Sequence, residues 1–527
     1  MNKVHVVFIA PEEYNNLGIG YLSSVLKGSG YRASIIDFKK SRKDILRILK
    51  QSDPDIIGFS IICYDFLMEF GALIEFLRKA GISSHFTSGG HYPSLKTGEL
   101  FSLIPALDSV VRFEGENTML ELTGKIISGL EWRDTEGIAY RENGSVIFNR
   151  LRPLEKDIDQ FPFPYRTHLR KFAYDIPMAT ILAGRGCLGN CSFCNTRKFY
   201  ENPGGPLKRI RKPELVVSEM KMLHRKRKCS VFLFMDDDFP VRPAKDADWP
   251  LRFCDELEKE NLNDKIIWKI SCRVDEVETE RFSIMKKNGL FLVFIGIEDG
   301  TDAGLKRMNK HITTAQIKES VGILKKLDLG IDFGFLLFQP STTFRSLNEN
   351  LDFLLEICGD GYMPVAFQKL MPFYGTRVET ELIEEGRLIS GSVIQDYDFY
   401  DEAMNSYYRF TYECFSEWLT NPYGVQNLSN WVRNYFLVYS RYFGKDRSWK
   451  NLNRKFRGII AESNLFVLDT MKDLSLLFEN GEYIKNGNLD EFSDGIRKKH
   501  KHYQRKVYDY FDSLYNLAIY KIGQSMA

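Results

Sequence analysis

Three cysteines stand close together in this 527-residue chain, as Cys187, Cys191 and Cys194 in the pattern C-x3-C-x2-C. Thiolates ligate iron–sulfur clusters, and a cluster with four irons usually takes four of them. A tight group of three therefore leaves one iron open to a ligand that the protein does not supply. Glycines in and before the run let the backbone approach a bulky ligand closely. The spacing predicts a [4Fe-4S] cluster held by these cysteines.

Other uses of clustered cysteines fit the sequence less well. A structural zinc site takes four ligands, usually as two separated pairs, and no second Cys or His pair follows at that spacing. The chain has nine cysteines, a sparse and odd number, so a disulfide framework is poorly supported. Chance clustering of buried thiols is the remaining alternative, and the glycines argue against it.

Polar residues follow apolar runs further along the chain. They are Asp236, Asp237 and Asp238 after the run 231–235, Arg273 after 266–271, and Glu298 after 290–297. A carboxylate suits an ammonium group, and an arginine suits a carboxylate through paired hydrogen bonds. Together these residues would complement an amino acid moiety. They could also cap the helices that follow, and the two roles are compatible.

The elements that must position these residues read as repeated strand–helix units. The candidate strands are 180–183, 231–235, 266–271, 290–297, 331–338 and 365–370. Mostly apolar strands are typical of a parallel barrel buried on both faces, and this number falls short of the eight of a full barrel. Active sites of such barrels lie at the carboxyl ends of the strands, where the polar residues stand.

The rest of the chain divides by pattern. Residues 1–130 alternate apolar runs with helical patterns, which predicts a parallel sheet covered by helices. Residues 131–178 hold a hairpin around Asn143-Gly144 and a linker punctuated by prolines. The barrel region spans 179–394, and aromatic residues at helical spacing predict a mainly helical domain over 395–527. The sequence therefore predicts an α/β protein with a helical C-terminal domain.

Composition is that of an ordinary soluble protein, with 44% hydrophobic and 27% charged residues. A formal net charge of +2 gives no general signal for nucleic acid binding. The basic run 497–506 is more often a solvated helix face, although it could dock an acidic or phosphate-bearing substrate. No apolar run is long enough to span a membrane, and the N-terminus lacks a signal-peptide pattern. We expect a reducing, cytoplasmic location, which an oxygen-sensitive cluster would require.

The cysteine spacing resembles the signature of the radical SAM enzymes. In that family the open iron chelates S-adenosylmethionine, and an electron from the cluster cleaves it to a 5′-deoxyadenosyl radical. The resemblance implies a partial (β/α)6 barrel and an external electron donor of the flavodoxin or ferredoxin type. It also implies cofactor contacts: one of Asp236, Asp237 and Asp238 to the methionine amine, Arg273 and Glu298 to its carboxylate and ribose, and Phe193 to the adenine. Phe193 could equally be loop packing, and the triple Asp stands where many members have Gly-Gly-Glu.

Segments of the first region resemble the cobalamin-binding Rossmann-like domain, whose patterns are D-x-H-x-x-G, S-x-L and a Gly-Gly pair. The implied cobalamin contacts are Glu13, Asn15, Gly18, Ser60, Gly89, Gly90, His91 and, in a G-E-G-E-type turn, Glu114. Asn15 stands where the histidine of the motif would ligate cobalt, so we expect no protein imidazole from that position. His91 could replace it, but a lone histidine is more often a structural residue. An empty flavodoxin-like domain is the alternative.

The two resemblances, over about residues 1–390, imply a cobalamin-dependent radical SAM enzyme similar to the methyltransferases. Such an enzyme would use the 5′-deoxyadenosyl radical to transfer a methyl group from methylcobalamin to an unactivated carbon of a peptide or natural-product substrate. The same cofactors could instead serve radical cyclisation, ring contraction or oxidation, and a non-catalytic corrinoid-binding protein is a further alternative. Gln339, Gln368 and Tyr374 could face the substrate or form turns. Nothing in the C-terminal third identifies the substrate.

Overall fold

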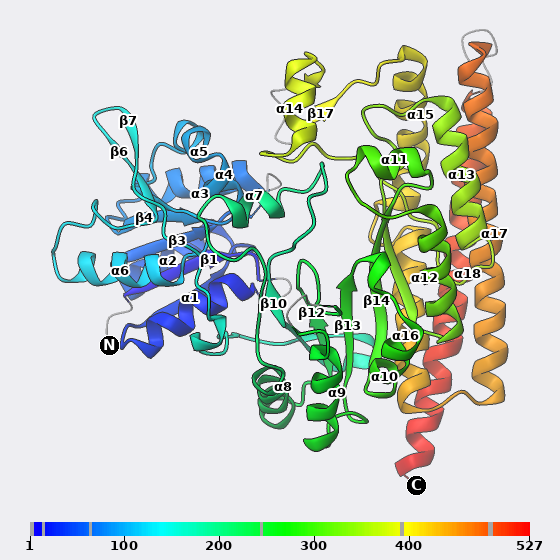
Figure 1. The fold of residues 1–527 in the computed structure, drawn as a ribbon, viewed down its shortest axis with the longest axis horizontal. Helices are drawn as coiled ribbons and strands as arrows, with labels where there is room; N and C mark the ends of the chain where they lie inside the picture. The colour runs from blue at the N-terminus through cyan, green and yellow to red at the C-terminus, as the bar shows by residue number, and fades with distance from the viewer. Residues whose placement is uncertain are drawn as a thin grey trace.

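The computed structural model describes residues 5–12, 16–62, 66–242, 246–389, 395–482 and 489–526. Three regions follow one another across the molecule in Figure 1. An N-terminal α/β domain lies on the left, a curled sheet flanked by helices occupies the middle, and long C-terminal helices run along the right. This arrangement confirms the predicted Rossmann-like domain, partial barrel and mainly helical C-terminal region.

The N-terminal sheet has the strand order β2-β1-β3-β4-β5-β6-β7. Its parallel strands are β1 (Val6–Ala10), β2 (Ala33–Asp37), β3 (Ile56–Ser60), β4 (His85–Gly89) and β5 (Ser109–Val111), followed by the antiparallel β6 (Ile138–Glu142) and β7 (Ser145–Phe148). The helices are α1 (Leu17–Gly28), α2 (Arg42–Ser52), α3 (Leu67–Lys79), α4 (His91–Leu95), α5 (Thr97–Leu103) and α6 (Glu116–Ile127). The hairpin predicted around Asn143-Gly144 is confirmed between β6 and β7.

Alternation along β1 shows how this sheet is covered on both sides. Val7 and Ile9 join an apolar cluster with α2 and α3, whereas Val6 and Phe8 join a second cluster with α1 and α6. Successive strand residues point to opposite faces, so helices on both faces bury the whole strand. Strands β2 and β3 lie on opposite sides of β1, so the strand order reverses there. Doubly wound sheets bind ligands at the carboxyl ends of the strands beside this reversal.

The second large sheet has the order β15-β14-β13-β12-β9-β8. Its strands are β8 (Arg170–Lys171), β9 (Pro177–Ile181), β12 (Val231–Phe234), β13 (Ile267–Cys272), β14 (Leu290–Glu298) and β15 (Gly330–Phe335), all parallel except β8. The helices that follow them are α8 (Pro213–Arg227), α9 (Trp249–Lys259), α10 (Thr279–Lys287), α11 (Asp302–Arg307), α12 (Thr314–Lys326) and α13 (Phe344–Cys358). Short elements are β10 (Gly184–Arg185), β11 (Arg209–Ile210), α7 (Thr196–Glu201) and the 3-10 turns 158–160, 173–175 and 274–276.

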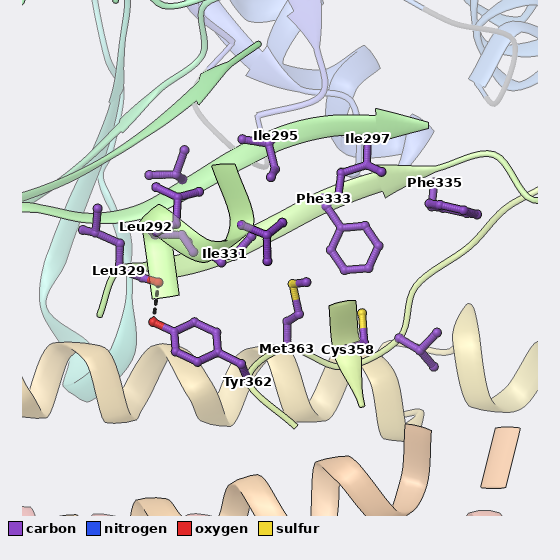
Figure 2. Close-up of a cluster of buried hydrophobic side chains, with 14 of the residues drawn as sticks. Leu292, Ile295, Ile297, Leu329, Ile331, Phe333, Phe335, Cys358, Tyr362 and Met363 are labelled. Carbon is purple, nitrogen blue, oxygen red and sulfur yellow. Dashed lines mark hydrogen bonds between the residues drawn. The ribbon is translucent and has the colours of Figure 1, made fainter. Parts of the chain in front are cut away.

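One face of this sheet packs against helices. Figure 2 shows Ile295, Ile331 and Phe333 from β14 and β15 above the segment that carries Tyr362 and Met363. The Tyr362 hydroxyl donates a hydrogen bond to the carbonyl of Leu329 at 2.7 Å. Because successive side chains of a strand point to opposite faces, the residues between these helix-facing ones point into the interior of the half-barrel.

The C-terminal region begins with α14 (Arg377–Glu384), β16 (Leu388–Ile389) and β17 (Asp396–Tyr397). Four long helices follow, α15 (Glu402–Leu419), α16 (Val425–Tyr442), α17 (Arg447–Glu479) and α18 (Leu489–Met526). Many of their aromatic residues are buried between the helices; Trp418, for example, stacks on Phe466 with ring centroids 5.6 Å apart. Within the described ranges, we find no helix long and apolar enough to cross a membrane.

The sixth strand predicted for the barrel, 365–370, is present as a short pairing with the end of β15 and the residues that follow it. The Gln368 amide donates to the Phe335 carbonyl at 2.9 Å, and the Leu370 amide donates to the Phe338 carbonyl at 2.7 Å. Lys369 and Phe338 form a parallel bridge. Nearer the start of β15, the guanidinium of Arg433 of α16 donates to the Ile331 carbonyl at 2.6 Å and pairs with Asp332.

A buried ion triad ties the linker to the barrel. Glu219 of α8 is fully buried and lies 2.7 Å from both Arg166 of the linker and Arg211, which follows β11. Two guanidinium groups around one carboxylate satisfy its charge, whereas removal of the carboxylate would leave both cations buried.

We therefore expect Glu219→Gln to lower the free energy of unfolding by about 3 kcal/mol, because a buried charge loses its partner. Denaturant unfolding of the purified protein measures this change. Glu214→Gln on the same helix is the matched control, since Glu214 is exposed and lies 3.8 Å from an exposed Arg252. An equal loss for both variants would contradict the buried triad.

Candidate functional site

The cysteine loop lies between β10 and α7, after the first parallel strand of the barrel. Gly186 has φ of 85°, and a Cβ there would lie 1.8 Å from the carbonyl oxygen of Leu207, so only glycine fits. The Gly189 amide donates to Cys187 Sγ at 3.2 Å. A Cβ on Gly189 would stand 3.2 Å from Cys187 Sγ and 4.0 Å from Cys191 Sγ. The two sulfurs therefore flank one glycine in a loop that leaves all three cysteines partly exposed.

The thiolates of the three cysteines would suit the irons of a cluster. Among the described residues, no three or more His, Cys, Asp or Glu side chains converge on one metal position. A four-iron cluster takes its thiolates on different irons, so its ligands stand apart. Burial raises the pKa of Cys187 to about 11, with a contribution from Asp238, and raises the pKa of Cys191 as well. Iron would displace these protons as it binds.

Cationic and acidic groups surround Cys191. Glu298 ends β14 and forms an ion pair with Lys310 at 3.0 Å, and both side chains are buried. Burial alone would lower the pKa of Lys310, but Glu298 and Cys191 raise it above its ordinary value. Arg273 donates to Asp275 at 2.9 Å and to the Lys310 carbonyl at 3.0 Å. The structure thus brings Arg273 and Glu298 beside the cysteines and adds Lys310, which no local sequence pattern distinguished.

The three predicted aspartates separate. Asp236 accepts hydrogen bonds from the amides of Ala183 at 3.1 Å and Gly184 at 2.6 Å. Burial raises its pKa to about 7. Asp237 accepts from the amide of Gly186 at 3.1 Å. These two carboxylates brace the backbone that leads into the cysteine loop.

Asp238 differs from its neighbours. One of its oxygens pairs with Lys208, and the other is buried without a hydrogen-bond partner in the described part of the chain. Its charge contributes to the raised pKa of Cys187. It also contributes, after burial, to the pKa of Glu276, which is raised to about 8. A buried oxygen without a donor beside the cluster loop suits an ammonium group.

A cavity of about 620 Å³ lies between the N-terminal domain and the barrel. The predicted cobalamin contacts that line it are Gly18, Ser60, Gly89, Gly90, His91 and Glu114. From the barrel side it is lined by Thr180, Leu182, Arg185, Phe199, Tyr200, Met235 and Asp237. Predicted contacts Glu13 and Asn15 lie outside the described residues. The next residue, Asn16, donates to Ser60 at 3.2 Å and caps α1.

The glycines of the cavity meet two different needs. Gly90 has φ of 124°, a conformation that side chains rarely adopt, and its Cβ would collide with the backbone of Ile61. A Cβ on Gly18 would meet only Asn16 Oδ1, at 3.5 Å. Gly18 therefore leaves open space toward the cavity that a larger side chain would fill. A cavity lined in this way fits a bulky, flat cofactor such as a corrinoid.

Two predicted contacts also join the domains. The His91 ring stacks on Phe199 of α7, with centroids 4.0 Å apart and planes 8° from parallel. Burial lowers the pKa of His91 to about 4, so the stacked ring is neutral. Glu114 lies 2.7 Å from Arg209 and 3.2 Å from Arg185, and these arginines lower its pKa against the effect of burial.

The remaining predicted residues lie further from the open space. Phe193 is partly buried and packs against the apolar core of the barrel. Gln339 is buried and donates to Asp299, and the Tyr374 hydroxyl donates to the Ile62 carbonyl at 3.0 Å. Gln368 is exposed.

Comparisons with known proteins match both the N-terminal domain and the barrel. Residues 5–123 match the B12 binding domain, and residues 181–354 match the Radical SAM superfamily. The cobalamin-dependent S-adenosylmethionine radical enzyme OxsB, solved with aqua-cobalamin and S-adenosylmethionine, has a similar fold with a TM-score of 0.67 and 19% identity. That comparison covers 96% of this chain and 84% of OxsB.

Two curated relatives resemble the chain over most of their length. An uncharacterized methyltransferase of Pyrococcus horikoshii is 27% identical, over 71% of this chain and 80% of its own. The anaerobic magnesium-protoporphyrin IX monomethyl ester cyclase of Rubrivivax gelatinosus is 26% identical, over 74% of this chain and 73% of its own.

The half-barrel with its cysteine loop defines a radical SAM enzyme. With its B12 binding domain, the chain belongs to the cobalamin-dependent radical SAM enzymes. The cofactors of this family are a [4Fe-4S] cluster, S-adenosylmethionine and cobalamin.

Replacing any one of Cys187, Cys191 and Cys194 by Ala should abolish stable cluster binding, because two thiolates cannot hold the cluster. Iron analysis and the visible absorbance of anaerobically reconstituted protein measure the loss. Cys254→Ala is the control, since Cys254 is buried in α9. Iron content at the wild-type level in any of the three variants would remove that cysteine from the ligand set.

Gly18→Leu should block cobalamin binding without unfolding the domain, because the new side chain enters the cavity rather than the protein interior. The corrinoid absorbance that stays with the protein after gel filtration measures binding. Gly98→Leu on α5 is the matched control, since it is an exposed helical glycine with nothing within 4 Å of its Cβ position. Equal cobalamin binding by both variants would show that the corrinoid does not occupy this cavity.

Proposed function

We propose that this enzyme transfers a methyl group to an unactivated carbon of a peptide or natural-product substrate. The observation that carries the proposal is the single cavity lined by Gly18 and Ser60 of the N-terminal domain and by Leu182 and Met235 of the barrel. When bound, the cofactors supply a 5′-deoxyadenosyl radical and a methyl group. One shared cavity favours transfer by proximity, because both groups would meet the same substrate.

The residues near the cysteines suit the amino acid end of S-adenosylmethionine. We assign the ammonium to the free oxygen of Asp238, and the carboxylate to Arg273 and Lys310. Glu298 is assigned to the ribose, and Phe193 to the adenine. Asp236 and Asp237 then serve as positioning residues, since their carboxylates hold the backbone before Cys187.

The corrinoid is assigned to the cavity above the first sheet. Gly18 leaves space for it, Gly89 and Gly90 line the cavity, and Ser60 offers a polar contact. Glu13, outside the described residues, is assigned to the corrinoid from the sequence alone. His91 and Glu114 contribute chiefly by holding the barrel against the N-terminal domain, through the Phe199 stack and the arginine pairs. Asn15 stands in the sequence where the motif has its histidine, so this position would supply no imidazole to a bound corrinoid.

Radical cyclisation without methyl transfer is the second candidate. The relative from Rubrivivax gelatinosus is named as a cyclase, and it resembles this chain over about the same extent as the methyltransferase from Pyrococcus horikoshii. Both outcomes use the same cofactors, so the cavity does not separate them. For either one, an electron donor of the flavodoxin or ferredoxin type would reduce the cluster.

Reduction of the cobalamin-loaded, cluster-reconstituted protein under anaerobic conditions should convert S-adenosylmethionine to 5′-deoxyadenosine. With substrate present, methyl transfer adds one methylene unit to the product mass, whereas cyclisation by dehydrogenation removes a pair of hydrogens. Chromatography and mass spectrometry measure both. The Cys194→Ala variant is the control. Absence of 5′-deoxyadenosine from the intact enzyme would overturn the proposed radical chemistry.

A further inference from the structure

Lys269 of β13 faces the interior of the half-barrel. Strand register aligns Thr180 of β9, Leu233 of β12 and Lys269 in one row across the sheet. Residues in register point to the same face, and Thr180 lines the cavity between the domains. Two residues further along β13, Ser271 points the same way and aligns with Phe294 of β14.

The row below Lys269 closes the interior. Met178, Val231 and Ile267 align there and are buried, with exposed fractions of 6%, 0% and 0%. Above them, Leu233, Lys269 and Ser271 are only partly buried. The inner face of the sheet is therefore closed just below Lys269, and we call this level the floor of the half-barrel.

This ammonium lacks an acidic partner. Its Nζ donates to Ser271 Oγ at 2.9 Å, and no carboxylate lies within ion-pair distance of it in the described part of the chain. The carboxylate of Asp332, on the same face, is already paired with Arg433. Burial lowers the pKa of Lys269, and the charges of Asp332, Cys272 and Asp236, none of them within ion-pair distance, raise it only in part.

We propose that the substrate of this enzyme carries an anionic oxygen group, a carboxylate or a phosphate, that binds Lys269 and Ser271 at the floor of the half-barrel. An ammonium has three protons, so the bond to Ser271 leaves two for a ligand. The Ser271 hydroxyl accepts from Lys269, and its own proton remains available to donate. Together they form a donor pair suited to an anion.

The position of this pair sets the orientation of the substrate. Arg273 lies four residues further along, or about 13 Å up an extended strand, beside the cysteine loop. An anion held at Lys269 keeps the rest of the substrate pointing toward the cofactors. This inference rests on the proposed function, because it names the substrate class of the same site.

The first test is equilibrium dialysis of the cobalamin-loaded, cluster-reconstituted enzyme with S-adenosylmethionine present throughout. The probes are labelled inorganic pyrophosphate and labelled glutarate. Lys269→Met should weaken binding by about tenfold or more, because a charge-assisted contact is lost. Lys269→Arg should retain most of it, and Lys326→Met, at an exposed lysine of α12, should change nothing.

The second test uses the wild-type enzyme, so it does not depend on folding of a variant. Limited acetylation followed by peptide mass spectrometry should show slower modification of Lys269, but not of Lys326, when the anion is bound. Protection by pyrophosphate alone assigns a phosphate, protection by glutarate alone assigns a carboxylate, and protection by both supports an anion site of either kind.

Wild-type enzyme that binds neither probe, or binds both as tightly as Lys269→Met does, overturns the inference. Binding that disappears when S-adenosylmethionine is added also overturns it, since the probe would then occupy the cofactor position. Neither test requires turnover. Failure of the proposed radical chemistry and failure of this anion site therefore give different results.

Discussion

The ion pairs between Arg185, Arg209 and the Glu114–Glu116 turn hold the two cofactor domains together. Arg185 lies 2.7 Å from Glu116 and 3.2 Å from Glu114, and its guanidinium is also over the Tyr21 ring. Desolvation penalises every one of these charges, so the pairs are stable only when both domains are in contact. Arg185 precedes Gly186 and Cys187 directly. The strand that begins the cluster loop is thus the strand that anchors the cobalamin domain, and cluster and cavity are placed together.

Local spacing predicts the cysteine loop, because cluster ligands from one loop need no distant partner. It also predicts the hairpin at Asn143-Gly144, where two adjacent residues supply the required backbone conformation. Fold class follows from the alternation of strands and helices, and from the resemblance to known families. These features depend on residues near one another in the chain.

The finer features depend on distant residues. Asp236, Asp237 and Asp238 are equivalent in the sequence, and only their contacts with distant residues distinguish them: the amides of Ala183 and Gly184, the amide of Gly186, and Lys208, respectively. Lys310 has no motif and is identified only by its contact with Glu298. The run 365–370 has the composition of a strand, but it pairs only with the end of β15, while Arg433, far along the chain, binds the Ile331 carbonyl nearer the start. No local pattern carries that information.

The C-terminal helices affect the chemistry of the barrel interior as well as its stability. Arg433 enters from α16 and binds both the edge carbonyl of Ile331 and the carboxylate of Asp332. Without this guanidinium, Asp332 would be the natural counter-ion for a cation on the same face of the sheet. Its pairing with Arg433 leaves Lys269 without an ion pair, although the Asp332 charge still raises the pKa of Lys269 against the effect of burial. A helix of the C-terminal region therefore influences the charge on the inner face of the barrel sheet.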